Sequence, residues 1–114
     1  MLRALLATFV AGYAELWNAA DPIAGHVRSL DDPAPGSNAR FGALSSLPVA
    51  PDDPPKAMEM VRILVEGHEA VARTARAVFP LADKADDQPT ADLPTQRLTV
   101  HEQAAWMLRS LLEG

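Results

Sequence analysis

The side chains of this sequence that could do chemistry are three histidines and a group of aspartates, because the chain has no cysteine. The lack of thiols excludes disulfides, thiolate metal sites and cysteine nucleophiles. Two His-Glu pairs, which begin at His68 and His101, match the first half of a helical zinc-protease motif. That motif needs a second histidine four residues later, and alanine stands at both positions, Ala72 and Ala105. Each pair is therefore interpreted as part of a solvated helix face.

An acidic cluster of Asp83, Asp86, Asp87 and Asp92 lies where a turn leads into a predicted helix. Carboxylates are stabilised at a helix N-terminus by its partial positive charge, so one interpretation is a solvated helix start. The other interpretation is a cation-attracting ring, which forms when symmetry brings several copies of the cluster together. One chain alone supplies too few well-placed oxygen ligands to hold a hard cation.

The composition argues against several classes of protein. The formal net charge is −5 and no run of Lys or Arg occurs, whereas nucleic-acid binding needs concentrated positive charge to neutralise phosphates. No apolar stretch is long enough to span a bilayer. The sequence has no glycine-rich phosphate loop and no nucleophile-elbow context for a serine–histidine–aspartate triad. We therefore expect a cytoplasmic protein, with a short secretory signal over residues 1–14 as the alternative.

The length of 114 residues suits one compact domain, and the apolar spacing predicts that this domain is all-α. An amphipathic helix starts near the N-terminus, and Pro22 should kink it or make it restart with Asp21 as the cap. Residues 31–55 contain six prolines and are predicted to form a connection. A short helix in its middle should pack its apolar residues against the bundle. Those apolar residues are Phe41, Leu44 and Leu47.

Two further long helices complete the predicted fold. One begins near Pro55 and is ended by Pro80. The other has Thr90 as its cap and continues almost to the C-terminus. Trp17 and Trp106 occur at helical spacing within apolar stripes, so both are predicted to pack in the core. The expected architecture is three long helices plus one short crossover helix.

Four stretches of the sequence resemble the Dps-type mini-ferritins, and the similarity covers nearly the whole chain. The first looks like the second bundle helix, leading into the family's Asp-x-x-Ala-Glu-Arg signature. The next two look like the end of that helix and the third helix, and the last, most specific one looks like the fourth. The resemblance implies a ferritin-like helical bundle that forms homo-oligomers, binds and stores iron, oxidises ferrous ions and protects against stress. The stretches are Tyr13–Ala24, Arg28–Ser37, Met58–Glu69 and Pro89–Arg109.

The departures from the family concern its iron site. The chain resembles the family only from the second helix onward, so the first helix and its histidine ligand are expected to be absent. Aligned on the signature, Asp21 stands at a ligand position, whereas Leu6, Val10 and Gly25 replace the other ligands. Iron oxidation needs several N and O ligands in fixed geometry, so these replacements predict weak or lost ferroxidase activity. His26, in place of the signature arginine, is a second metal candidate, although it points about 100° away from Gly25.

The resemblance also suggests how the protein works without a full iron site. It assigns the family's cation entry region to Asp86, Asp87 and Asp92, and the chain lacks the family's basic DNA-binding tail. Loss of one helix of four would expose apolar surface, which a second copy, another protein or closer packing of three helices could cover. The first hypothesis is a dimeric or cage-forming Dps-like protein with a degenerate ferroxidase site. The alternatives are a non-catalytic oligomerisation or protein-interaction module and a fragment of an active ferroxidase.

Overall fold

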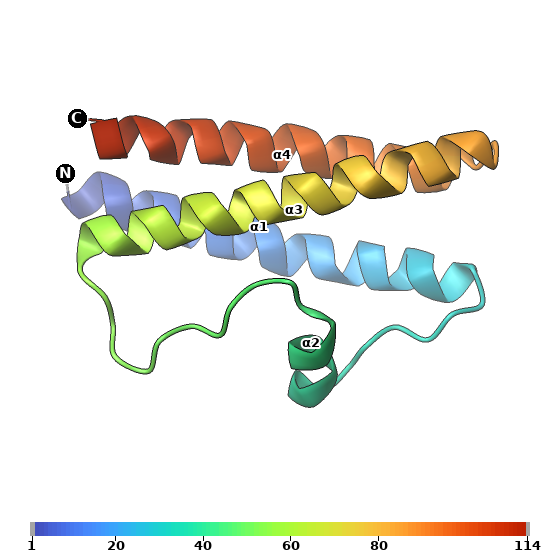
Figure 1. The fold of residues 1–114 in the computed structure, drawn as a ribbon, viewed down its shortest axis with the longest axis horizontal. Helices are drawn as coiled ribbons and strands as arrows, with labels where there is room; N and C mark the ends of the chain where they lie inside the picture. Colours follow the sequence, from blue (N-terminus) through green and yellow to red (C-terminus); the bar gives the residue numbers. More distant parts are fainter. Residues whose placement is uncertain (1, 114) are drawn as a thin grey trace. The chain divides into compact units, whose positions relative to one another are not determined.

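A computed structural model describes residues 2–113 of the protein. These residues contain helices and no strand, which confirms the all-α prediction. The helices are α1 (Leu2–Ser29), α2 (Asn38–Leu44), α3 (Ala57–Lys84) and α4 (Gln88–Glu113) (Figure 1). The chain comprises two compact units, residues 1–41 and 42–114. Within residues 2–113, no helix is both long and apolar enough to cross a membrane.

The first unit consists mainly of α1, which continues through Pro22. Of the two expected alternatives, a kink or a restart with Asp21 as the cap, the restart is wrong, because the same helix runs on to Ser29. A proline inside a helix loses one backbone hydrogen bond and presses its ring against the preceding turn. Alanine, the strongest helix former, precedes the proline at Ala20 and follows it at Ala24, which offsets part of that cost.

Two of the helices end on an aspartate in the left-handed conformation, Asp31 after α1 (φ 64°) and Asp86 after α3 (φ 56°). Aspartate tolerates this conformation better than most residues, because its short side chain can hydrogen-bond locally. In both cases the next residue donates its backbone N–H to the carbonyl five residues earlier, which is the Schellman arrangement. These bonds join Asp32 to Val27 (3.4 Å) and Asp87 to Ala82 (3.0 Å).

The connection between α1 and α3 contains the short helix α2. Ser37 caps α2, because its hydroxyl accepts a backbone N–H three residues later (3.2 Å). No residue of α2 is buried. Phe41, Leu44 and Leu47 are 49%, 59% and 43% exposed. The prediction of a short helix here is confirmed, whereas the prediction that its apolar residues are packed is wrong for this chain.

The second unit is built on an antiparallel hairpin of α3 and α4, which lie side by side (Figure 1). On each helix one line of buried and half-buried positions is spaced alternately by three and four residues, the pattern of coiled-coil packing. We call this line of residues the seam. Many of its members are alanines, whose small side chains let the helices approach closely. The seam consists of Val61, Val65, His68, Ala72, Ala75, Phe79 and Ala82 on α3, and Ala91, Pro94, Leu98, His101, Ala105, Leu108 and Leu112 on α4.

The seam explains why α3 is longer than predicted. The helix does not end at Phe79 but continues through Pro80 to Lys84. Ala82 in this last stretch and Ala91 at the start of α4 are 6% and 1% exposed. Burial of this end of the seam therefore outweighs the backbone hydrogen bond that the proline cannot make.

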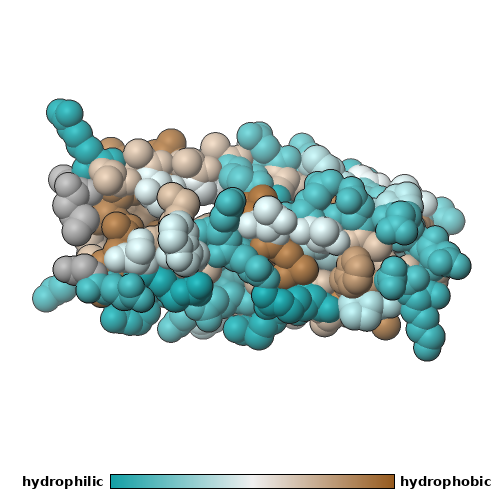
Figure 2. Space-filling model, turned by 90° about the horizontal axis from the view of Figure 1, so that it is seen from above, coloured by the Kyte–Doolittle hydropathy of each residue, from teal (hydrophilic) through white to brown (hydrophobic). Residues whose placement is uncertain are grey.

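The face of the molecule in Figure 2 is mostly hydrophilic, with its apolar side chains in separate patches. One large apolar side chain that is exposed in the second unit is Trp106, at 65%. The prediction that Trp106 packs in the core is therefore wrong. It follows the seam residue Ala105 directly, and one residue of helix turns a side chain by about 100°, away from α3.

Candidate functional site

The positions that the resemblance assigns to the family's iron ligands lie on one face of α1. At about 100° per residue, positions 6, 10, 21 and 25 of this continuous helix fall within a sector of about 100°. Leu6 and Val10 are 62% and 59% exposed, and Asp21 is exposed as well. A Cβ added to Gly25 would meet no atom of the described residues within 4 Å. The four positions therefore share one open face, on which Asp21 alone carries a metal-binding side-chain atom.

His26 does not join that face. It is five residues along α1 from Asp21, so the two side chains leave the helix about 140° apart. His26 is half-buried, whereas Asp21 is exposed. Within residues 2–113, no three or more His, Cys, Asp or Glu side chains are grouped so that they could hold a metal ion. The metal-binding roles of Asp21 and His26 stay predictions.

Two aromatic side chains extend the open face of α1. Tyr13 and Trp17 are 70% and 71% exposed, so the prediction that Trp17 packs in the core is wrong. Their rings are stacked, with centroids 6.4 Å apart and planes inclined by 10°. Together they present a broad, flat apolar surface to solvent. With the two aliphatic side chains above they form a continuous line, which we call the α1 stripe: Leu6, Val10, Tyr13 and Trp17.

The predicted cation-entry residues Asp86 and Asp87 form the turn between α3 and α4. Asp86 ends α3, and Asp87 caps α4, since its Oδ1 accepts the backbone N–H of Thr90 (3.2 Å). The Thr90 hydroxyl donates to the other oxygen of Asp87 (2.5 Å). The predicted cap at Thr90 is therefore wrong. Asp92 is exposed and accepts a hydrogen bond from Gln96 (2.8 Å), so the three aspartates have local structural partners or roles in this chain.

His68 and His101 meet within the seam. Their Nδ1 atoms are 2.8 Å apart, and His101 is 2% exposed. The interpretation as a solvated helix face is therefore wrong for His101, although Glu69 and Glu102 beside the two histidines lie at the surface. The contact between the two histidines was not predicted from the sequence. The signal in the sequence that could have revealed it is spacing, because each histidine continues the three-and-four spacing of the buried residues on its own helix.

Arg97 determines where the protons of the pair lie. A guanidinium can only donate, and its Nη2 and Nε lie 2.8 and 3.3 Å from Nε2 of His101. Nε2 of His101 is therefore an acceptor, and the ring carries its proton on Nδ1. That proton points at His68, whose Nδ1 accepts it. We assign a directed row of hydrogen bonds from Arg97 through His101 to His68, with both rings neutral.

Comparison with known proteins agrees with this architecture. The family model for the ferritin-like domain matches residues 2–114. The X-ray structure of Dps from Thermosynechococcus elongatus superposes with a TM-score of 0.90 at 22% identity, covering 96% of this chain and 69% of that one. The expected ferritin-like helical bundle is therefore confirmed.

Two curated relatives share more sequence with the chain. An uncharacterized low temperature-induced protein of Nostoc sp. is 41% identical over 103 residues, which is 90% of this chain and 58% of the relative. A homolog of that protein in Anabaena variabilis matches equally well. The chain thus spans somewhat more than half the length of these relatives. Because the family model covers almost every residue, the chain belongs to the ferritin-like domain family.

Proposed function

We propose that this protein is a Dps-like, cytoplasmic ferritin-type protein that takes part in iron handling and stress protection as a homo-oligomer, with little or no ferrous oxidation of its own. Iron is its cargo and not a resident cofactor. The observation that carries the proposal is the ligand face of α1. Asp21 stands there beside Leu6, Val10 and Gly25, although the family model for the ferritin-like domain matches residues 2–114.

The chemistry of that face supports a loss of oxidation. A carboxylate–histidine centre holds iron through several N and O atoms, and methyl groups or a hydrogen atom cannot replace them. Asp21 alone gives at most one carboxylate, which a hard cation binds weakly. The stress role is supported by the names of the two relatives, which describe a low temperature-induced protein and its homolog.

The acidic turn supports passive cation binding as the remaining chemistry. Asp86 and Asp92 are exposed, so their carboxylates face solvent even though Asp87 is committed to its cap. In a symmetric oligomer, several copies of this turn around one axis would multiply the negative charge at a single place. Such a concentration of carboxylates raises the local concentration of cations.

The α1 stripe supports assembly. Its four side chains are between 59% and 71% exposed and form one apolar line along the helix. Contiguous apolar surface of this kind marks association sites in folded proteins. We assign the stripe to contact with a second copy of the chain, because most soluble oligomers are homo-oligomers and a two-fold axis pairs a patch with itself.

An iron-loading experiment tests the proposal. Purified protein is mixed with ferrous ions in air, and the appearance of ferric product, the iron retained and the oligomeric state are measured together. We expect an oligomer that retains cations while oxidation stays near the uncatalysed rate, in the wild type and in Asp21→Ala alike. The matched control is Asp32→Ala, which removes a carboxylate outside the ligand face. Rapid oxidation that Asp21→Ala abolishes and Asp32→Ala preserves would mean that an active centre survives.

A second candidate function is a non-catalytic oligomerisation or protein-interaction module. The stacked, exposed Tyr13 and Trp17 favour it, because exposed aromatic side chains are typical of protein contact surfaces. The same experiment separates the two functions. An oligomer that retains no iron above a buffer control favours the interaction module, whereas iron retention favours the ferritin-type function.

A further inference from the structure

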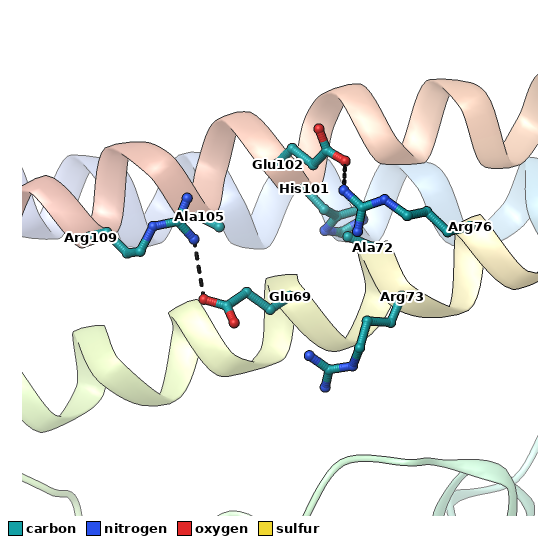
Figure 3. A pocket seen from close by; sticks show the side chains of 8 residues that line it. All are labelled: Glu69, Ala72, Arg73, Arg76, His101, Glu102, Ala105 and Arg109. Atoms are coloured by element: carbon teal, nitrogen blue, oxygen red, sulfur yellow. Dashed lines mark hydrogen bonds and ion pairs between the residues drawn. The ribbon is translucent and has the colours of Figure 1, made fainter.

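One flank of the α3–α4 hairpin contains a hollow of about 420 Å³ (Figure 3). Its floor includes Ala72 and Ala105 from the seam, and its rim carries Arg73 and Arg76 from α3 and Arg109 from α4. The hollow lies wholly within the second unit and far along the chain from the ligand face of α1. None of the iron chemistry proposed above uses it.

Side-chain size at the seam explains why the hollow exists. On this flank the helices are joined by two cross-helix ion pairs, one at each end of the hollow. Arg109 donates to Glu69 (3.2 Å), and Arg76 pairs with Glu102. Between these pairs the seam residues Ala72 and Ala105 offer only methyl groups beside His101, so space stays open above them.

The charges around the hollow do not balance. Three arginines and two glutamates line the hollow. His101 on its inner wall is neutral, because its Nε2 accepts a hydrogen bond from Arg97. No acidic side chain within residues 2–113 pairs with Arg73. Figure 3 shows its guanidinium turned away from α4 beside α3. The hollow therefore carries one positive charge that the described residues leave without a counter-charge.

The arginines around the hollow also have more N–H donors than their ion pairs with the two glutamates use. A guanidinium has five N–H groups. Arg76 and Arg109 each commit one nitrogen to a glutamate, which leaves N–H groups of both side chains for another acceptor. Arg73 lies one turn before Arg76 on α3, so a rotation about its flexible side-chain bonds brings a third guanidinium over the same opening.

We propose that this hollow is a binding site for a phosphate-class oxyanion. Guanidinium forks match the oxygen geometry of phosphate and carboxylate. A single fork satisfies a carboxylate, whereas a dianion with three or four oxygens can accept from guanidiniums on two helices at once. The hollow is larger than inorganic phosphate, so it also admits a phosphomonoester whose organic part occupies the remaining space.

The test is a titration of the full-length protein with inorganic phosphate at constant ionic strength, held with chloride. Binding is followed by calorimetry and by the backbone amide NMR signals of Ala72 and Ala105. We expect saturable binding that shifts both signals. Arg73→Gln should weaken it about tenfold, and Arg73→Glu should abolish it. Since Arg73 is exposed, both variants should fold, which circular dichroism verifies.

Arg62→Gln is the matched control, because Arg62 is an exposed arginine of the same helix that pairs with Glu59 (3.1 Å) outside the hollow. It should bind phosphate like the wild type.

A parallel titration with glucose 6-phosphate identifies the source of the anion: tighter binding than phosphate points to an organic monoester, and equal binding points to free phosphate. Non-saturable binding, or equal affinities of the wild type and Arg73→Gln, would overturn the proposal.

Discussion

The seam between α3 and α4 and the stripe on α1 are both apolar lines at helical spacing, but they have opposite fates. Val61 in the seam is fully buried, whereas Trp17 in the stripe is 71% exposed. The seam is built largely from alanine, which allows close approach of two helices within one chain. The stripe is built from large side chains, two of them aromatic. Periodicity thus identifies an apolar face, while side-chain size indicates whether that face packs against a helix of the same chain or is left for contact with another chain.

The largest difference between the seam and the stripe is expected when the same charge is placed on each of them. Val61→Asp puts an unpaired carboxylate at a fully buried position, which costs several kcal/mol against a typical total of about 5–15 kcal/mol. We expect this variant to lose its helical circular dichroism. Val10→Asp adds the same charge at a position 59% exposed and should keep its helical content. A native melting temperature for Val61→Asp would show that the seam is not the core.

The second prediction concerns association through the stripe. At about 25 cal/mol per Å² of apolar surface removed from water, covering a helix-sized stripe contributes several kcal/mol to association. Light scattering should therefore find at least a dimer at micromolar concentration, and Leu6→Asp should shift it toward monomer. Asn18→Asp adds the same charge beside Trp17 but off the stripe, and should leave the assembly intact. A well-folded wild-type monomer over the same concentrations would refute the assignment.

The third and smallest expected effect concerns the polar row inside the seam. His101→Leu removes the acceptor of Arg97 and the donor to His68 while keeping a similar volume. Leaving buried polar groups without their partners costs about 1–3 kcal/mol, so the free energy of unfolding in urea should fall by that amount. Adding His68→Leu should recover part of the loss, because the pair is then replaced by apolar contact.

Gln103→Leu is the control for this prediction, since it makes an exposed position of α4 apolar and should change the unfolding free energy by less than about 0.5 kcal/mol. If His101→Leu unfolds at the same urea concentration as the wild type, the row from Arg97 to His68 contributes no net stability. It would then serve only to set the register of the two helices, as buried polar residues do in some coiled coils.

The sequence predicts the class of this fold better than its surfaces. The all-α bundle and its one short helix are confirmed, because apolar spacing and proline-rich connections are local signals. The errors come from interactions between distant residues. Pro80 does not end α3, because the seam continues to Ala82. Asp87 caps α4 in place of Thr90, so α4 begins three residues earlier than predicted.

The candidate sites separate in the same way. Spacing alone places Leu6, Val10 and Asp21 on one face of α1, as the structure has them. It cannot tell that Trp17 and Trp106 are exposed, because exposure depends on which helix packs against which face. Nor does it reveal that His68 and His101 meet, since that needs the register between two helices joined through the turn at Asp86 and Asp87.

That turn also has a consequence for the speed of folding. Asp86 stops one helix and Asp87 starts the next, so Ala82 and Ala91 of the seam are separated by only a few residues of chain. Contacts between residues close in sequence form early, because little chain entropy is lost in closing a short loop. The hairpin can therefore nucleate at its turn and zip outward, with Val61 and Leu112 joining last. Two adjacent aspartates at this turn thus help to set the rate of folding as well as the geometry of the hairpin.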